Sequence, residues 1–170
     1  MDSVTLKSLC DMTYGLYIVS SRDGDRLNGQ IVNTAFQVTA EPARIAVGIN
    51  RKNLTHDYIT RTGRYTLAAL AQSAPMTFIG LFGFRSGRDT DKFAVAGHGK
   101  TASGLPVPKE HTLSVLEVLV EKTVELDTHT LFIGTIAGAE KIAEGEPLTY
   151  SYYHNVLKGK TQKNATTYNS

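Results

Sequence analysis

The segment from Leu113 to Ile142, LSVLEVLVEKTVELDTHTLFIGTIAGAEKI, constrains the fold more than any other part of the chain. Valine, isoleucine, leucine and threonine recur along it, and the run is broken near Asp127–Thr128. Residues of these types favour strands, and two such runs separated by a turn are typical of an antiparallel hairpin. The segment therefore predicts a long hairpin and a chain rich in β structure.

Shorter strand and helix signals precede this hairpin. Asp23–Gly24 is a hairpin signal, Asn53 is a plausible N-cap, Gly63 is a helix stop, and Pro75 suits a first helical turn. Strands are expected at 14–21, 28–39, 43–50 and 64–70, and short helices at 53–63, 74–84 and about 89–93. Because the regular alternation and glycine fingerprint of a doubly wound nucleotide fold are missing, we expect a mainly β fold with short helices, a small closed or split β-barrel.

The length and composition set broad limits on function. With 170 residues the chain suits a single domain, 1–170, and its formal charge of +2 does not demand nucleic acid or anionic lipid, although a small anionic ligand fits. Cys10 is the only cysteine, which excludes an intrachain disulfide and CxxC-type metal sites. No signal peptide or long apolar window is visible, so we expect a protein of the reducing cytoplasm, with no membrane partner.

The segment Asn28–Thr39, NGQIVNTAFQVT, contains amides and a hydroxyl where a plain buried strand would carry aliphatic residues. One interpretation is a half-exposed strand with its polar face in water. The other is a ligand site, because a buried heteroaromatic ligand needs hydrogen-bond donors and acceptors from the protein.

Two further segments combine cations with helix starts or loops. In NRKNLTH, 50–56, cations and a hydroxyl gather at a helix N-terminus, which suits a phosphate group. In SGRDTDKF, 86–93, Arg88 and Lys92 are four residues apart, and a guanidinium suits phosphate oxygens. A capped helix and a surface Arg/Asp network explain the same residues equally simply.

Histidine and the basic C-terminus complete the candidates. The five histidines are scattered without metal-ligand spacing, so no metal site is predicted. His129 opens the second strand of the long hairpin, a position compatible with either a structural or a functional role. From about 150–170 the chain carries three lysines after its last acidic residue, and this C-terminal arm is expected to lie on a partner subunit or to form an anion site.

Six short motifs in register resemble the flavin reductase-like proteins of the FMN-binding split-barrel family, most of all flavoredoxins and the flavin domain of high-molecular-weight rubredoxins. The motifs are TYGLYIVSS, NGQIVNTAFQVT, INRKNLTHDYI, FGFRSGRDTDKF, THTLFIGTI and EGEPLTYSYYHNVLKGKT. The resemblance extends from Thr13 to about Tyr168. It implies a Greek-key split barrel, a homodimer, and FMN reduced by NADH or NADPH.

The resemblance also implies roles for particular residues. His129 corresponds to a histidine near the flavin and the nicotinamide, which makes it the candidate catalytic residue. The segments that line the isoalloxazine, the ribityl chain and the phosphate correspond here to Asn28, Gln30, Val32, Asn33, Thr34, Arg51, Lys52, Asn53, Thr55, Arg88 and Lys92.

Two functions follow from the resemblance. The first is an NAD(P)H-dependent reductase that passes electrons to an acceptor such as free flavin, a rubredoxin or a flavodiiron protein. The second is a flavoredoxin-like carrier that a protein partner reduces. A rubredoxin iron needs four cysteines, so an acceptor of that kind would be a separate molecule. A nucleic-acid-binding module is disfavoured, because the basic excess is small.

Overall fold

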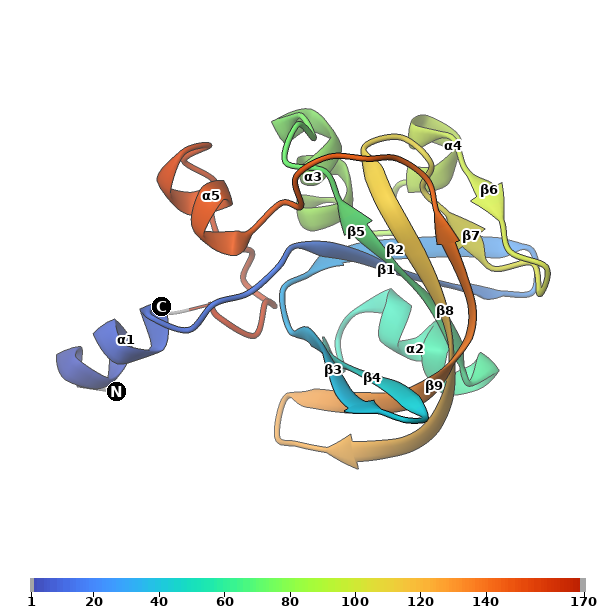
Figure 1. The fold of residues 1–170 in the computed structure, drawn as a ribbon, viewed down its shortest axis with the longest axis horizontal. Helices are drawn as coiled ribbons and strands as arrows, with labels where there is room; N and C mark the ends of the chain where they lie inside the picture. The colour runs from blue at the N-terminus through green and yellow to red at the C-terminus, as the bar shows by residue number, and fades with distance from the viewer. Residues whose placement is uncertain (1, 169–170) are drawn as a thin grey trace.

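The computed structural model describes residues 2–168 and is mainly β, as the sequence predicts (Figure 1). The strands are β1 (Tyr17–Asp23), β2 (Arg26–Val32), β3 (Ala35–Ala40), β4 (Ala43–Asn50), β5 (Arg64–Leu70), β6 (Gly99–Lys100), β7 (Pro106–Val107), β8 (Thr112–Glu125) and β9 (His129–Lys141). The helices are α1 (Ser3–Cys10), α2 (Leu54–Thr62), α3 (Met76–Phe84), α4 (Lys92–Ala96) and α5 (Tyr150–Asn155).

Seven strands form one antiparallel sheet in the order β2-β1-β5-β8-β9-β4-β3. The long β8–β9 hairpin curves strongly, and register shifts along β8 accompany the bend (Figure 1). The two edge strands, β2 and β3, are joined directly through Asn33–Thr34, and the Gly48 N–H donates to the Thr34 carbonyl at 2.9 Å. The sheet therefore curls into the split barrel that the sequence predicts.

Side chains from strands near both edges of the sheet fill the barrel interior. Val19 of β1 and Val32 of β2 pack in one cluster with Val47 of β4 and Phe132 of β9. Helix α2 adds Ile59 to this cluster and ends at Gly63, whose φ of 64° is easy for glycine. This packing holds the first turn of α2 against the barrel, where the polar segments converge.

A second core lies between the sheet and the remaining helices. Phe78 and Phe82 of α3 pack with Phe93 of α4, and Leu148 joins them from the segment that leads into α5. The Phe82 and Phe93 ring centroids are 5.4 Å apart in an edge-to-face arrangement. The cluster fixes the end of α3 and the start of α4 beside β2.

Most predicted elements are present, and three predictions need correction. The segment 28–39 is not one strand: it breaks at Asn33–Thr34, where the chain leaves β2 and begins β3. The first predicted strand, 14–21, begins only at Tyr17, and the turn expected at 89–93 becomes α4, which begins at Lys92. The sequence does not predict helices α1 and α5 or the β6–β7 pair. Within residues 2–168, no helix is long and apolar enough to cross a membrane.

Candidate functional site

Two adjoining pockets lie where β2, the start of α2, the end of α3 and the C-terminal segment meet. Counting space that is open to solvent, the first encloses about 590 Å³ and the second about 610 Å³. The pockets share lining residues from all four elements: Gln30, Ile31, Asn53, Gly83, Phe84, Gln162 and Asn164.

Strand β2 presents two amides to these pockets, that of the buried Asn28 and that of the half-buried Gln30. Asn28 and Gln30 are two residues apart, so their side chains lie on the same face of the strand. The Asn28 amide Nδ2 donates to the Thr55 hydroxyl at 2.8 Å, whereas the Asn28 Oδ1 and Gln30 Oε1 oxygens are buried without a partner. Buried acceptors of this kind are costly unless a ligand supplies donors.

The first turn of α2 faces the second pocket. Asn53 is the N-cap residue, but its side chain makes no capping hydrogen bond; its Oδ1 accepts instead from Asn164 Nδ2 at 3.2 Å. The amides of this turn therefore have no side-chain cap, and Lys52 and the fully buried Thr55 stand beside them. A helix N-terminus in this state favours an anionic group.

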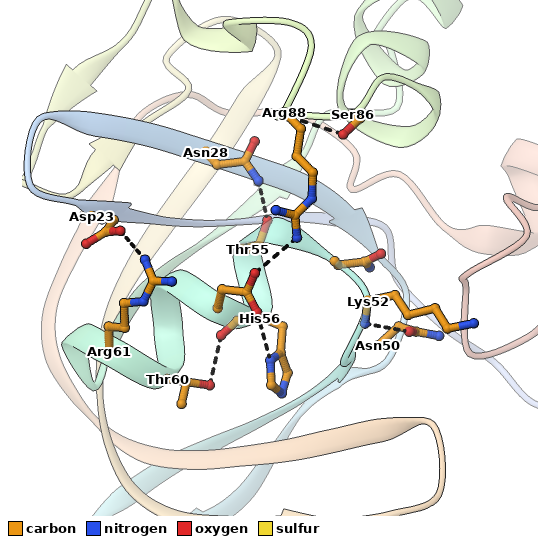
Figure 2. A network of polar contacts seen from close by, with 12 residues as sticks. Asp23, Asn28, Asn50, Lys52, Thr55, His56, Thr60, Arg61, Ser86 and Arg88 are labelled. Carbon is orange, nitrogen blue, oxygen red and sulfur yellow. Dashed lines mark hydrogen bonds and ion pairs between the residues drawn. The ribbon is translucent and has the colours of Figure 1, made fainter.

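The loop after α3 supplies further positive charge. Arg88 reaches toward α2, where its Nη2 lies 3.1 Å from Asp57 Oδ2 (Figure 2). Gly87 packs so closely on Asn28 that a Cβ at this position would lie 2.0 Å from the Asn28 Oδ1. The loop therefore depends on glycine to lie against β2.

Lys92 is a buried lysine at the back of the second pocket. Its Nζ donates to the carbonyls of Gly29 at 2.8 Å and Phe82 at 3.4 Å, and burial lowers its pKa to about 8. Among the described residues that line the two pockets there is no carboxylate, whereas the cations are Lys52, Arg85, Arg88, Lys92 and Lys160. The lining therefore carries more positive than negative charge, although Arg88 is paired with Asp57 just outside it.

His129 opens β9 and lines the first pocket. Its Nδ1 lies 2.7 Å from the Thr128 hydroxyl, and its Nε2 is buried without a partner. Burial lowers the pKa of His129, and the backbone of Asn164 partly offsets this effect. The lowered pKa favours the neutral imidazole at neutral pH, and Nε2 has no hydrogen-bond partner of good geometry in the structure.

Ten of the twelve predicted site residues line the two pockets. They are Asn28, Gln30, Val32, Asn33, Lys52, Asn53, Thr55, Arg88, Lys92 and His129.

The structure does not bring Arg51 to the pockets. Its guanidinium donates to the Leu126 carbonyl and lies 3.7 Å from Glu125, because the turn before α2 directs it toward the β8–β9 turn. Thr34 also does not line them: its side chain packs on Gly48, 3.2 Å from where a Cβ would stand. In β4 this glycine permits the close approach.

The C-terminal segment contributes residues that the sequence reasoning missed. Gln162 and Asn164 line both pockets, and Tyr150 of α5 lines the first. The available signal was the amide- and hydroxyl-rich run TQKNATT at 161–167, which follows the last acidic residue, Glu146. The sequence predicts that this arm contacts a partner subunit or forms an anion site; in the structure it lies on its own barrel, and contact with a partner stays a prediction.

The unpaired polar atoms fit a flavin mononucleotide. The side-chain oxygens of Asn28 and Gln30 have no hydrogen-bond donor in the structure. The N3–H of an isoalloxazine and the hydroxyls of a ribityl chain are donors that suit them. The cationic pocket at the α2 N-terminus suits the phosphate. Within residues 2–168, no group of three or more His, Cys, Asp or Glu side chains could hold a metal ion.

Comparison with known proteins reveals similarity along most of the chain. A family model described as a flavin reductase like domain matches residues 9–157. The chain is 47% identical over 162 residues to the high molecular weight rubredoxin of Moorella thermoacetica, covering 95% of this chain and 71% of that protein. It is 41% identical over 157 residues to a ferric-chelate reductase (NAD(P)H) of Archaeoglobus fulgidus, covering 92% and 93%.

The fold matches that of solved flavoproteins. The flavoredoxin of Methanosarcina acetivorans superimposes with a TM-score of 0.70 at 21% identity, covering 79% of this chain and 74% of that one. The family match spans most of the chain, from before β1 to the end of α5. The chain therefore belongs to the flavin reductase-like family.

Proposed function

We propose that the chain is an FMN-containing reductase that takes hydride from NADH or NADPH and passes electrons to an acceptor such as free flavin, a rubredoxin or another redox protein. The observation that carries the proposal is the group of buried, unpaired polar atoms on Asn28, Gln30 and His129, gathered beside a carboxylate-free cationic pocket. The name of the Archaeoglobus fulgidus relative, ferric-chelate reductase (NAD(P)H), supports the choice of donor.

In this proposal each pocket holds one part of the cofactor. The first pocket, with Gln30, Val32, Asn33 and His129 in its wall, takes the isoalloxazine. The second, with cations around the α2 N-terminus, takes the phosphate, where Thr55 and the neighbouring amides donate hydrogen bonds. Lys92 acts mainly through the field of its ammonium group, since Nζ already donates to two backbone carbonyls.

His129 serves the reaction without transferring a proton. When bound, FMN supplies the redox chemistry: it accepts hydride from the nicotinamide and releases electrons singly or in pairs. The neutral imidazole, with Nδ1 occupied by Thr128, presents Nε2 to the ligands and orients the nicotinamide. The protein's task is to hold the rings in place and to exclude water.

We further propose a homodimer. Phe36 and Val38 of β3 are 52% and 46% exposed, and Val124 and Leu126 at the end of β8 are 45% and 53% exposed. Both groups lie on the lower part of the barrel in Figure 1. Exposed apolar edge strands of this kind are usually covered by a partner. Sedimentation equilibrium of Phe36→Glu beside the unchanged protein tests this: the variant should sediment as a monomer, and an unchanged mass would contradict the interface.

The acceptor and the compartment complete the proposal. The Moorella thermoacetica relative is named a rubredoxin, which supports an acceptor of the rubredoxin type. A lone exposed Cys10 is consistent with a reducing cytoplasm.

The absorption spectrum of the purified protein, followed by anaerobic titration with NADH and then NADPH, tests the central claim. Flavin bands that bleach on addition of nicotinamide nucleotide would support the reductase. Flavin bands that resist both nucleotides would replace it with a carrier fed by a protein partner. Absence of flavin, even after soaking with FMN, would refute both.

A further inference from the structure

The C-terminal segment Lys160–Thr167, called the strap below, lies across both pockets. Gln162 and Asn164 line both, while Lys160, Thr161, Ala165 and Thr166 line the first. The strap thus forms one wall where the isoalloxazine and phosphate sides meet, opposite residues of β2 and α3 that also line both pockets.

Two side chains fasten the strap to the barrel. Asn164 Nδ2 donates to Asn53 Oδ1 at 3.2 Å, and Asn33 Nδ2 donates to Thr167 Oγ1 at 2.9 Å. Thr167 Oγ1 also lies 2.7 Å from the Tyr150 hydroxyl. Asn33 and Asn53, the barrel residues to which the strap is hydrogen-bonded, both line the first pocket. The two hydrogen bonds that hold the strap to the barrel are therefore part of the site.

At its start the strap is tied to α5, where the Tyr153 hydroxyl donates to the Lys160 carbonyl at 2.9 Å and Thr161 Oγ1 lies 2.7 Å from the Tyr150 hydroxyl. Its second half is held more lightly. The backbone N–H groups of Ala165 and Tyr168 donate within the C-terminal segment, to Gln162 and Ala165, and not to a neighbouring strand. Lys163 and Thr166 are exposed. Segments fastened mainly by side-chain hydrogen bonds open at low free-energy cost compared with paired strands. Opening gives a ligand a route into the pockets, and closing covers it.

We propose that the strap is part of the flavin site and keeps FMN bound between turnovers, with Asn164 and Thr167 as positioning residues that hold it closed. This inference rests on the proposed function. It specifies a resident flavin from which electrons leave toward the acceptor, in contrast to a reductase that releases its reduced flavin as the product.

The rate of FMN release from the full-length protein tests the proposal. The FMN-loaded protein is mixed with an excess of an apoflavoprotein trap, and release is followed by fluorescence. Loss of one side-chain hydrogen bond corresponds to a change of about two- to tenfold. Asn164→Ala/Thr167→Val should therefore release FMN about tenfold faster or more, whereas Lys163→Ala, an exposed neighbour, should match the unchanged protein. Thr167→Ser keeps the hydroxyl and should retain slow release.

The direction of the change separates the alternatives. If the double variant releases FMN at the unchanged rate, the proposed role of the strap is wrong, whereas the proposed flavin site still stands. Slower release, or tighter binding, would also contradict that role, because the strap would then compete with FMN for the pocket. If the unchanged protein binds no FMN, the proposed function fails and the strap fails with it.

A second measurement needs no variant. Trypsin cleaves after lysine, and Lys160 and Lys163 are both exposed within the strap. Saturating FMN should slow cleavage at both positions relative to Lys122 on the barrel. Equal cleavage with and without FMN would contradict a strap that closes over the flavin.

Discussion

The side-chain amide of Asn28 donates to the hydroxyl of Thr55 over 2.8 Å, joining β2 to the first turn of α2 in the wall of the second pocket. Both residues are buried, at 3% and 0% exposure. Because the Thr55 oxygen accepts from Asn28, its O–H is left to donate beside the N–H groups of the helix start, which is the arrangement that the phosphate end of the proposed ligand requires.

Thr55→Val should destabilise the protein. Valine keeps the shape of threonine but leaves the buried Asn28 amide without its acceptor, which costs about 1–3 kcal/mol. Urea unfolding of the flavin-free protein measures the change. Thr60→Val, on the exposed side of the same helix, is the matched control and should stay within about 0.5 kcal/mol. Equal effects of the two substitutions would contradict the role given to this contact.

Arg88→Ala should weaken FMN binding about tenfold, because the guanidinium lies in the wall of the cationic pocket. Riboflavin, which lacks the phosphate, should bind both proteins equally. Arg51→Ala is the control, since Arg51 is turned toward the Leu126 carbonyl. Fluorescence titration of each protein with both ligands measures the affinities. An equal loss of affinity for FMN and for riboflavin would show that Arg88 does not contact the phosphate.

His129→Ala should impair use of the nicotinamide nucleotide more than flavin binding. Its unpaired Nε2 faces the first pocket, so we expect the NADH concentration for half-maximal bleaching to rise about tenfold, with the FMN Kd nearly unchanged. Anaerobic stopped-flow reduction provides the first quantity and FMN titration the second. His98→Ala, at an exposed position after α4, controls for loss of an imidazole. The prediction is wrong if FMN affinity falls as far as nucleotide use.

Lys92 should make stability rise with pH above about 8. Burial lowers the pKa of Lys92 to about 8 from 10.5, so between these values the unfolded chain binds more protons than the folded one. The free energy of unfolding of the flavin-free protein should therefore increase by up to about 1.4 kcal/mol per pH unit. Below pH 8 both states carry the proton and this contribution is constant.

Urea unfolding between pH 7 and about 9.5, below the range in which tyrosine ionises, tests the Lys92 prediction. Lys92→Met should lose the rise, whereas Lys122→Met, at an exposed lysine, should keep it. A slope that survives in Lys92→Met would assign the pH dependence to another group.

The sequence predicts those parts of the fold and site that depend on local patterns. Alternating β-branched residues predict the 113–142 hairpin. Asn28 and Gln30 are noticeable because they are amides in a segment whose pattern otherwise predicts a buried strand. Arg51 and Lys52 are adjacent in sequence, yet one points to the β8–β9 turn and the other lines a pocket. That difference depends on the geometry of the turn before α2, and the directions of two adjacent side chains in a turn cannot be predicted from a sequence pattern.

Tertiary contacts decide what the sequence could not predict. The strand break at Asn33–Thr34 follows from the close approach of Thr34 to Gly48, a residue of another strand. The strap lies on the barrel through single side-chain contacts from Asn164 and Thr167, so its hydrophilic composition resembles that of a solvated tail.

Asn53 stands at the N-cap of α2 without capping it, and this has a consequence for heat stability. A capping side chain ordinarily contributes about 1 kcal/mol to the free energy of unfolding, and the native state lacks this contribution at the start of α2. A phosphate-bearing ligand restores that deficit as well as adding its own binding free energy, so the melting temperature should climb with ligand concentration. A simple thermal-melt series across phosphate esters would thus rank what the pocket prefers, with no assay of turnover.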